Sequence, residues 1–416
     1  MRCRTSSSTL AGLRGLHLNI AKTVLVPLFR FQENEVRSII SSCAPDWGGV
    51  SITGAAKYLG FYGGPSKGET SWTSPMQKFK DRAKQWGSFG YGMLISIQAY
   101  QVYVSSVLQF IAQLEPLPDN FIGIELGAVR SLFPGPTAWM LPQCIKDMAH
   151  LHYPAALADM SATSQAAKIR VTRFENAQHG GLDVHRRANR LMDRYEVNCS
   201  LNHVAWCKEW GRHSFILNLM KADNDFTQLI RRTPHNTIDI SIRENFQRRT
   251  TPLFKSVVAG AAMIHLRRRM DRWSRMTTLP GHRPQKARSV MRVLQRRTTP
   301  RVQAAYLRTI CDGWCTSHRF QGRGCCVFGC RTGQDKLEHY AGCNMVAQLF
   351  ASCLNLHGPF NFDSFLCMND ETEEVTKARA SGIYALYRLY NGVRHNLFTP
   401  QEYHGAFQRY IAEGLR

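Results

Sequence analysis

The spacing of apolar and polar positions changes along the chain and separates a β-containing start from a helical remainder. Short apolar runs at 23–29 and 50–62 predict β-strands. A Gly-Gly-Pro break at 63–65 predicts that the second run forms a hairpin with a glycine-rich tip. From the Ser-Pro pair at 74–75 onward, apolar residues recur three and four apart, which predicts amphipathic helices. The expected fold is mainly α with a small β portion.

Helical spacing continues over 91–229, where prolines at 116–118 and 134–136 predict interruptions. One stretch, 86–114, has no charged residue and is long enough to cross a bilayer. Its glutamines and serines form a polar stripe, which favours a buried helix of a soluble core over a membrane span. We therefore expect no membrane partner.

The net charge of the chain indicates the class of its binding partner. The chain has 53 Lys and Arg against 30 Asp and Glu, a formal net charge of +23. Such an excess indicates a polyanionic partner, RNA or DNA before anionic lipid. The excess is concentrated in 243–301, where 16 basic residues stand against only Glu244 and Asp271.

The densest part of this region predicts a phosphate-binding helix. The residues expected to contact nucleic acid are Arg267, Arg268, Arg269, Arg272 and Trp273. The arginines would bind phosphates, and the indole ring could stack on a base or on an Arg plane. A solvated helix face is the alternative, but such faces normally carry interleaved acids, which are scarce here.

Cysteines concentrate near the C-terminus, with eight of the 13 lying between Cys311 and Cys367. A small secreted chain with this content would suggest disulfides, but this chain is large and basic. We therefore expect a reducing compartment, the nucleus or the cytoplasm.

A short segment within the cysteine-rich part has metal-ligand spacing. Its four expected ligands are Cys326, Cys330, His339 and Cys343. Two thiolates joined by a glycine-containing turn can hold one side of a tetrahedral ion. If 336–343 begins a helix, its i, i+4 spacing places the imidazole and the last thiolate on one face. The pattern predicts a structural Zn²⁺ site.

Other assignments of these cysteines remain open at the level of sequence. Cys325 competes with Cys326 as the first ligand. Cys311 and Cys315, with His318, could lend ligands to a four-thiolate site instead. Free buried thiols are the remaining reading.

Four stretches, taken in order, resemble the C-terminal part of a non-LTR retrotransposon reverse transcriptase. Residues 15–23, Gly-Leu-His-Leu-Asn-Ile-Ala-Lys-Thr, are similar to the strand that follows the catalytic hairpin in that family. Residues 57–61, Lys-Tyr-Leu-Gly-Phe, resemble its primer-gripping hairpin, and 72–86 resembles its first thumb helix. Gly313-Trp314, Arg319 and the four metal ligands resemble its terminal zinc-binding region.

This resemblance implies roles for further residues. Lys22 would lie close to the phosphates of an incoming nucleotide, as a candidate proton donor to pyrophosphate. The hairpin residues Tyr58, Leu59 and Gly60 would hold a primer end. Lys78 and Arg82 would lie along the primer–template backbone.

The resemblance also divides the chain into four expected parts. Residues 1–70 would form a palm remnant with the primer-grip-like hairpin, and 71–230 a helical thumb and connection region. Residues 231–310 would form a basic helical region, and 311–416 the zinc knuckle with C-terminal helices.

The chain departs from the family at the catalytic centre. Two-metal nucleotidyl transfer needs paired carboxylates, and no Tyr-x-Asp-Asp-like pair is present. We therefore expect a truncated protein that binds RNA or an RNA–DNA hybrid without polymerising. One alternative is part of an active RNA-directed DNA polymerase, completed by a missing N-terminal half and then requiring Mg²⁺. Another is a non-catalytic, zinc-stabilised scaffold that binds protein.

Overall fold

The computed structural model describes most of the chain. The described residues are 19–27, 31–136, 139–178, 215–232, 260–357, 360–369 and 371–415, with 186, 247, 250, 251 and 254. The chain divides into two compact units, each built from segments distant in sequence. Unit 1 is Met1–Gln77, Leu108–Pro118 and Ser161–Leu253, and unit 2 is Lys78–Val107, Asp119–Met160 and Phe254–Arg416. The four-part division drawn from the sequence remains a prediction.

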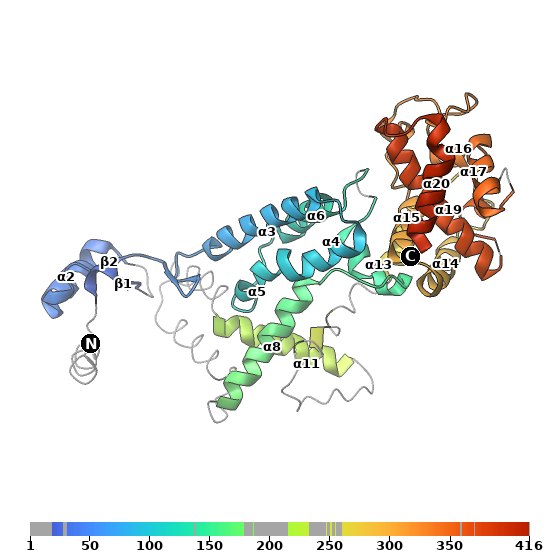
Figure 1. The fold of residues 1–416 in the computed structure, drawn as a ribbon. Coiled ribbons are helices and arrows are strands. Elements are labelled where there is room, and N and C mark those ends of the chain that lie inside the picture. The colour runs from blue at the N-terminus through green and yellow to red at the C-terminus, as the bar shows by residue number, and fades with distance from the viewer. Residues whose placement is uncertain are drawn as a thin grey trace. The chain divides into compact units, whose positions relative to one another are not determined.

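The described residues are mainly helical with a small β portion, as the sequence predicts (Figure 1). Among them, the strands form two two-stranded sheets. In unit 1, β1 (Val24–Leu25) pairs in parallel with β2 (Ser51–Ile52). Helix α2 (Glu33–Cys43) packs Val36 against this sheet. The predicted strand 23–29 is thus seen over two residues, and 28–30, like 15–18 of the family resemblance, lie outside the described residues.

The predicted hairpin is present, but its tip lies elsewhere. Strands β3 (Ala56–Tyr58) and β4 (Phe61–Gly63) are antiparallel, with Tyr58 opposite Phe61. The turn is Leu59-Gly60, with φ angles of 47° and 95°. A two-residue hairpin turn of this kind needs positive φ at both positions, a need that a glycine at the second position meets readily. The prediction of a tip at 63–65 is therefore wrong, since Gly63 belongs to a strand.

Helix α3 (Thr70–Ser88) begins earlier than the Ser-Pro pair predicts and contains Pro75. Its buried stripe is Trp72, Met76, Phe79 and Ala83. The stripe keeps helical spacing on both sides of Pro75. Burial of Trp72 therefore stabilises the turn before the Ser-Pro pair, where the sequence predicts that the helix has not yet begun. The residues of α3 up to Gln77 belong to unit 1 and those from Lys78 to unit 2. Unit 1 also contains α8 (Met160–Gln178), apart from its first residue, and α11 (Phe215–Arg232).

The uncharged stretch 86–114 forms a broken helix. It contains α4 (Met93–Ala99), the π-helix η3 (Tyr100–Val104) and α5 (Ser106–Ala112). Among the described residues, no single helix has the length and apolar character to cross a membrane. The pair Met93–Val104 and Ser106–Ala112, bent by 43°, passes that test together.

The rest of unit 2 is helical, and helices resume at Phe121 and at Pro142, after the two predicted interruptions. Its elements are α6 (Phe121–Leu132), α7 (Pro142–Lys146), η4 (Met148–Leu151), α13 (Ala261–Met270), α14 (Arg283–Arg297), α15 (Pro300–Ile310), η6 (His318–Phe320), α16 (Leu337–Ala341), α17 (Asn344–Leu354), α18 (Phe362–Phe365), α19 (Glu373–Arg394), η7 (Pro400–Glu402) and α20 (Tyr403–Leu415). Helix α19 packs against α14, α15, α17 and α20 and forms the centre of the C-terminal part.

A buried polar network holds the first segments of unit 2. The Glu125 carboxylate accepts hydrogen bonds from Tyr100 Oη at 3.0 Å and from Lys146 Nζ at 2.8 Å. Lys146 also pairs with Asp159 at 3.6 Å. Lys146 is the positively charged partner of these two buried carboxylates. A buried carboxylate without such a partner would be strongly destabilising.

Candidate metal centre

Four side chains of the cysteine-rich segment converge on one point. They are Cys326, Cys330, His339 and Cys343, and their ligand atoms all lie within 4.8 Å of one another. The two buried sulfurs, of Cys326 and Cys343, are 3.9 Å apart, and Cys330 Sγ lies 3.1 Å from His339 Nε2. A tetrahedral Zn²⁺ with bonds of about 2.3 Å to sulfur sets its ligands about 3.7 Å apart. The set therefore fits a metal ion such as zinc.

The first half of the centre is a turn closed by backbone hydrogen bonds. Cys326 N donates to Gly333 O at 2.9 Å, and Gly329 N donates to Cys326 O at 3.1 Å. Gly329 has φ of +75°, a conformation that few other residues adopt. The turn brings Cys330 back beside Cys326.

The second half comes from two helices and not from the single helix that the sequence predicts. His339 lies in α16, which ends at Ala341, and Cys343 is the N-cap of α17. The chain turns at Gly342, so Cys343 approaches from the start of the next helix. This position matters for its chemistry, because backbone N–H groups are unsatisfied at a helix start.

The pKa of Cys343 lies well below the ordinary thiol value. The main cause is a hydrogen bond from the Cys326 thiol, and the N–H groups of Val346 and Met345 add to it. The thiolate is the form that binds metal. The hydrogen bond from Cys326 and the start of α17 together favour the ionised ligand before any ion arrives.

The structure also separates the rival ligands. Cys326 is buried within the cluster, whereas Cys325 is exposed and its backbone pairs with Gln334. Neighbouring residues in an extended segment point to opposite sides, so only one of the two can face the centre. In the part of the chain that the structure describes, Cys311 and Cys315 join no such cluster.

Asp335 fixes the turn to the helices around it. Its side chain is buried and accepts hydrogen bonds from Ser317 N at 2.7 Å, Tyr340 Oη at 2.5 Å and Tyr390 Oη at 3.3 Å. The Trp314 ring lies 5.0 Å from that of Tyr390. Since Tyr390 belongs to α19, this helix packs on the metal-binding segment.

Glu338, the residue before the ligand His339, connects the centre to the basic segment. Its Oε1 accepts hydrogen bonds from Ser274 N at 3.1 Å, Ser274 Oγ at 3.1 Å and Arg275 N at 3.3 Å. No sequence pattern indicates this contact, because 64 residues separate Ser274 from Glu338. The helix that carries a ligand is thereby tied to the chain that follows α13.

The basic segment itself is only partly open to solvent. Arg267, Arg268 and Arg272 are exposed, and Arg267 lies 3.9 Å from Asp271. Arg269 and Trp273 are only 5% and 8% exposed. Arg269 lies on the packed side of α13 with Leu266 and Met270, and Trp273 is buried just after the helix ends. The predicted contacts of these two side chains with phosphate and base are therefore not available in this structure.

The burial of Trp273 has a definite set of partners. Its Nε1 donates to Ile310 O at 3.2 Å, and its ring lies 5.0 Å from that of Phe362. An aromatic ring with a satisfied N–H is a core anchor. Trp273 therefore positions the arginines next to it.

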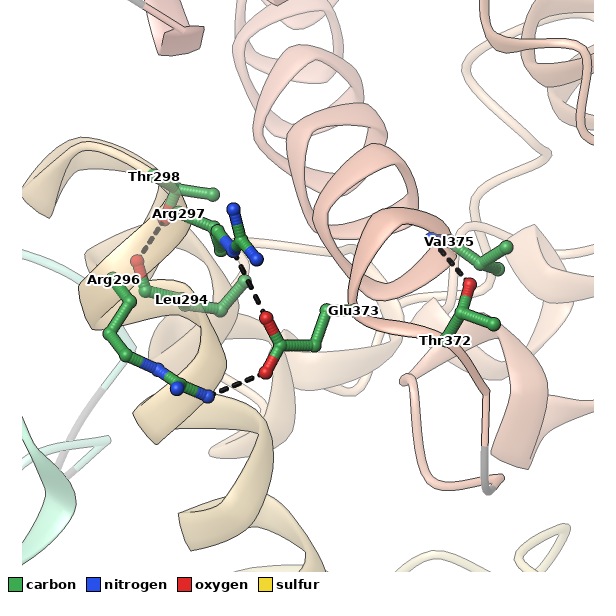
Figure 2. A network of polar contacts seen from close by, with 7 residues as sticks. All are labelled: Leu294, Arg296, Arg297, Thr298, Thr372, Glu373 and Val375. Carbon is green, nitrogen blue, oxygen red and sulfur yellow. Dashed lines mark hydrogen bonds and ion pairs between the residues drawn. The ribbon is translucent and has the colours of Figure 1, made fainter.

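Some arginines farther along are already paired with acid. Figure 2 shows Glu373, at the start of α19, between Arg296 Nη2 at 2.6 Å and Arg297 Nε at 3.0 Å. The helix start is capped next to it, where Thr372 accepts from Val375 N at 3.3 Å. The end of α14 is thus partly neutralised.

Two histidines have pKa values that nearby arginines help to lower. Burial lowers the pKa of His265, and nearby Arg268, Arg269 and Arg272 lower it further, against a hydrogen bond to Trp139 O. Burial also lowers the pKa of His152, with contributions from Arg292 and Arg288. Protonation of either histidine is unfavourable, because it would place another positive charge beside these arginines.

The remaining predicted site residues lie in separate places. Lys22 is exposed at the end of η1 (Ile20–Lys22), and Tyr58 and Leu59 are 65% and 74% exposed beside Gly60. These residues belong to unit 1. Lys78 and Arg82 belong to unit 2, as do the arginines and the metal ligands. Their predicted roles toward a nucleotide, primer or template stay predictions.

Comparison of the chain with protein-family models, curated proteins and solved structures finds no match. The functional assignment therefore depends on the geometry of the site and on the residues themselves.

Proposed function

We propose that this chain binds RNA or an RNA–DNA hybrid through its phosphates, as a reverse transcriptase-like protein of a retrotransposon that lacks the polymerase carboxylates. The observation that carries the proposal is the contact of Glu338 with Ser274 and Arg275. It links a four-ligand metal centre to a helix end with three exposed arginines.

Zinc would be held by Cys326, Cys330, His339 and Cys343. A site with four protein ligands leaves no open position for substrate, so the ion supplies cross-linking of the fold and no catalysis. Removal of the ion would release α16 and, through Glu338, the segment that follows α13. Metal binding and nucleic-acid binding are therefore expected to be coupled.

Charge identifies the partner class. Among the described residues, Arg268 and Arg272 are exposed and have no ion pair. Exposed guanidinium groups without acidic partners suit phosphate oxygens, which they bind in a bidentate manner. The net charge of +23 attracts such a polyanion over a longer range.

The experiment is a salt titration of binding to a short RNA–DNA hybrid. Counterion release makes log K fall linearly with log salt, by about one unit of slope per phosphate contact. Arg268→Ala with Arg272→Ala should weaken binding and reduce the slope by about two. The control is Arg37→Ala, a half-buried arginine of α2 that pairs with Glu33 and donates to Gly48 O.

Two results would contradict the proposal. One is binding that does not respond to salt, and the other is a wild-type protein that ignores RNA and DNA in dilute buffer. Either would favour a zinc-stabilised scaffold for protein partners. Nucleotide incorporation by this chain would instead favour the polymerase reading.

A further inference from the structure

A cluster of aromatic rings lies at the surface of unit 2, away from the metal ligands in sequence. Its members are Trp86, Phe89, Tyr91 and Tyr103. Trp86 and Tyr103 are stacked, with centroids 5.1 Å apart and planes at 28°. Phe89 and Tyr91 form a second near-parallel pair, 5.4 Å apart at 30°. Trp86 joins the pairs, since its ring lies 5.6 Å from Phe89.

Three of these rings are open to solvent, and Trp86 is half-buried among them. Phe89, Tyr91 and Tyr103 are 49%, 60% and 50% exposed. Large aromatic side chains dominate core energetics, so several gathered on a surface call for a binding role. Positive φ angles at Gly90 and Gly92, of 63° and 90°, let the loop turn back and present Phe89 beside Tyr91.

Cationic side chains continue the same helix stripe. On α3, Lys78, Arg82 and Trp86 follow one another at intervals of four residues, which places them along one side, and Phe89 comes directly after the end of the helix at Ser88. Arg82 Nη1 donates to Tyr103 O at 2.6 Å, so the helix is fixed to the π-helix η3. Between 78 and 114 the sequence has one acidic residue, Asp81, and 86–114 has none.

We propose that these rings form a stacking platform for the unpaired bases of single-stranded RNA or DNA. Lys78 and Arg82 would contact the phosphates on the approach to it. Planar rings accept any base face, and positive charge beside them suits a phosphate backbone better than an apolar protein segment or lipid tails. The inference rests on the proposed function for its class of partner, and it adds a second surface with a different specificity.

The test compares a single-stranded RNA of about 12 nucleotides with a duplex of equal length, using the full chain. Trp86→Ala and Tyr91→Ala should each weaken single-strand binding about tenfold. Duplex binding should change less than about twofold, because paired bases are not available for stacking. Trp86→Phe and Tyr91→Phe should restore most of the affinity. The control is Ile122→Ala in α6, where an apolar side chain is 67% exposed.

The salt dependence separates this inference from the proposed function. Loss of a stacking ring should lower affinity at every salt concentration without changing the slope, whereas loss of Arg268 and Arg272 changes the slope. Suppose the wild-type chain binds both RNAs, and neither alanine variant loses more affinity for the single strand than for the duplex. The platform is then refuted and the proposed function stands. If the wild-type chain binds neither RNA, both fail.

Discussion

A Cβ atom at position 333 would lie 2.1 Å from both Cε1 and Nδ1 of His339, so Gly333 leaves the space that the imidazole ring occupies. Real Cβ atoms do not approach other atoms this closely. Gly333 also accepts the hydrogen bond from Cys326 N. One glycine therefore serves both halves of the metal centre.

Gly333→Ala should displace His339 and weaken zinc binding about 10- to 100-fold, the usual cost of disturbing the groups that orient a ligand. Competition with a chromophoric chelator measures this. Gly342→Ala is the control, since its Cβ would meet only His339 O, at 3.9 Å. Equal zinc affinity of the two variants would show that the imidazole is not a ligand.

Removal of the Glu338 carboxylate should uncouple the basic segment from the centre. Glu338→Ala deletes the acceptor of three hydrogen bonds from Ser274 and Arg275. Because these groups are exposed and water can replace the acceptor, stability should fall by only about 1 kcal/mol. Hydrogen exchange at the 274 and 275 amides should accelerate, and affinity for the hybrid should fall. Glu338→Gln keeps an acceptor and should behave more nearly as wild type.

Glu373 should restrain nucleic-acid binding by neutralising Arg296 and Arg297. Glu373→Gln is expected to raise affinity for the hybrid a few-fold at low salt and to steepen the salt dependence. The cost in unfolding free energy should stay below about 1 kcal/mol, as for other exposed pairs. Glu33→Gln, which removes the acidic partner of Arg37 on α2, is the matched control. An unchanged affinity would place the end of α14 outside the contact surface.

The buried His265 should make stability depend on pH. Its neutral ring bonds Trp139 O at 2.9 Å, and its pKa is lowered by burial and by nearby arginines. Below the unfolded value of about 6.5, the unfolded chain takes up a proton before the folded chain does. The stabilisation is therefore complete above about pH 6.5 and is lost as pH falls through the folded pKa.

The measurement is the free energy of unfolding in denaturant between about pH 5 and pH 7.5, a window set around the reference pKa. His265→Gln should lose less stability on acidification than wild type, because an amide does not titrate and can still donate to Trp139 O. His404→Gln, at an exposed histidine of α20, should retain the wild-type dependence. Identical profiles for all three would contradict a buried neutral His265.

The sequence predicts the metal centre well because its ligands lie within 18 residues of one another. Local spacing then decides which side chains can meet. Local spacing does not show whether Cys325 or Cys326 is the first ligand, since that depends on which face of the extended segment turns inward. It also misses the end of α16 at Ala341, which moves Cys343 to the start of α17.

Burial of the basic segment is much harder to predict. A run such as 267–273 suggests uniform exposure, but tertiary packing buries Arg269 on one side of α13 and Trp273 just after the helix ends. The contact partners Ile310 and Phe362 are distant in sequence. The hairpin shows the same limit on a smaller scale, because its register was decided by Leu59-Gly60 and not by the more conspicuous Gly-Gly-Pro.

Quantitative metal analysis of the purified chain tests the central claim most directly. The account predicts one zinc ion per chain in wild type and in Cys325→Ser, and loss of that zinc with a lower melting temperature in Cys326→Ser and His339→Ala. A wild-type chain that contains no zinc, takes up none when it is supplied, and melts at the same temperature as Cys326→Ser would contradict it.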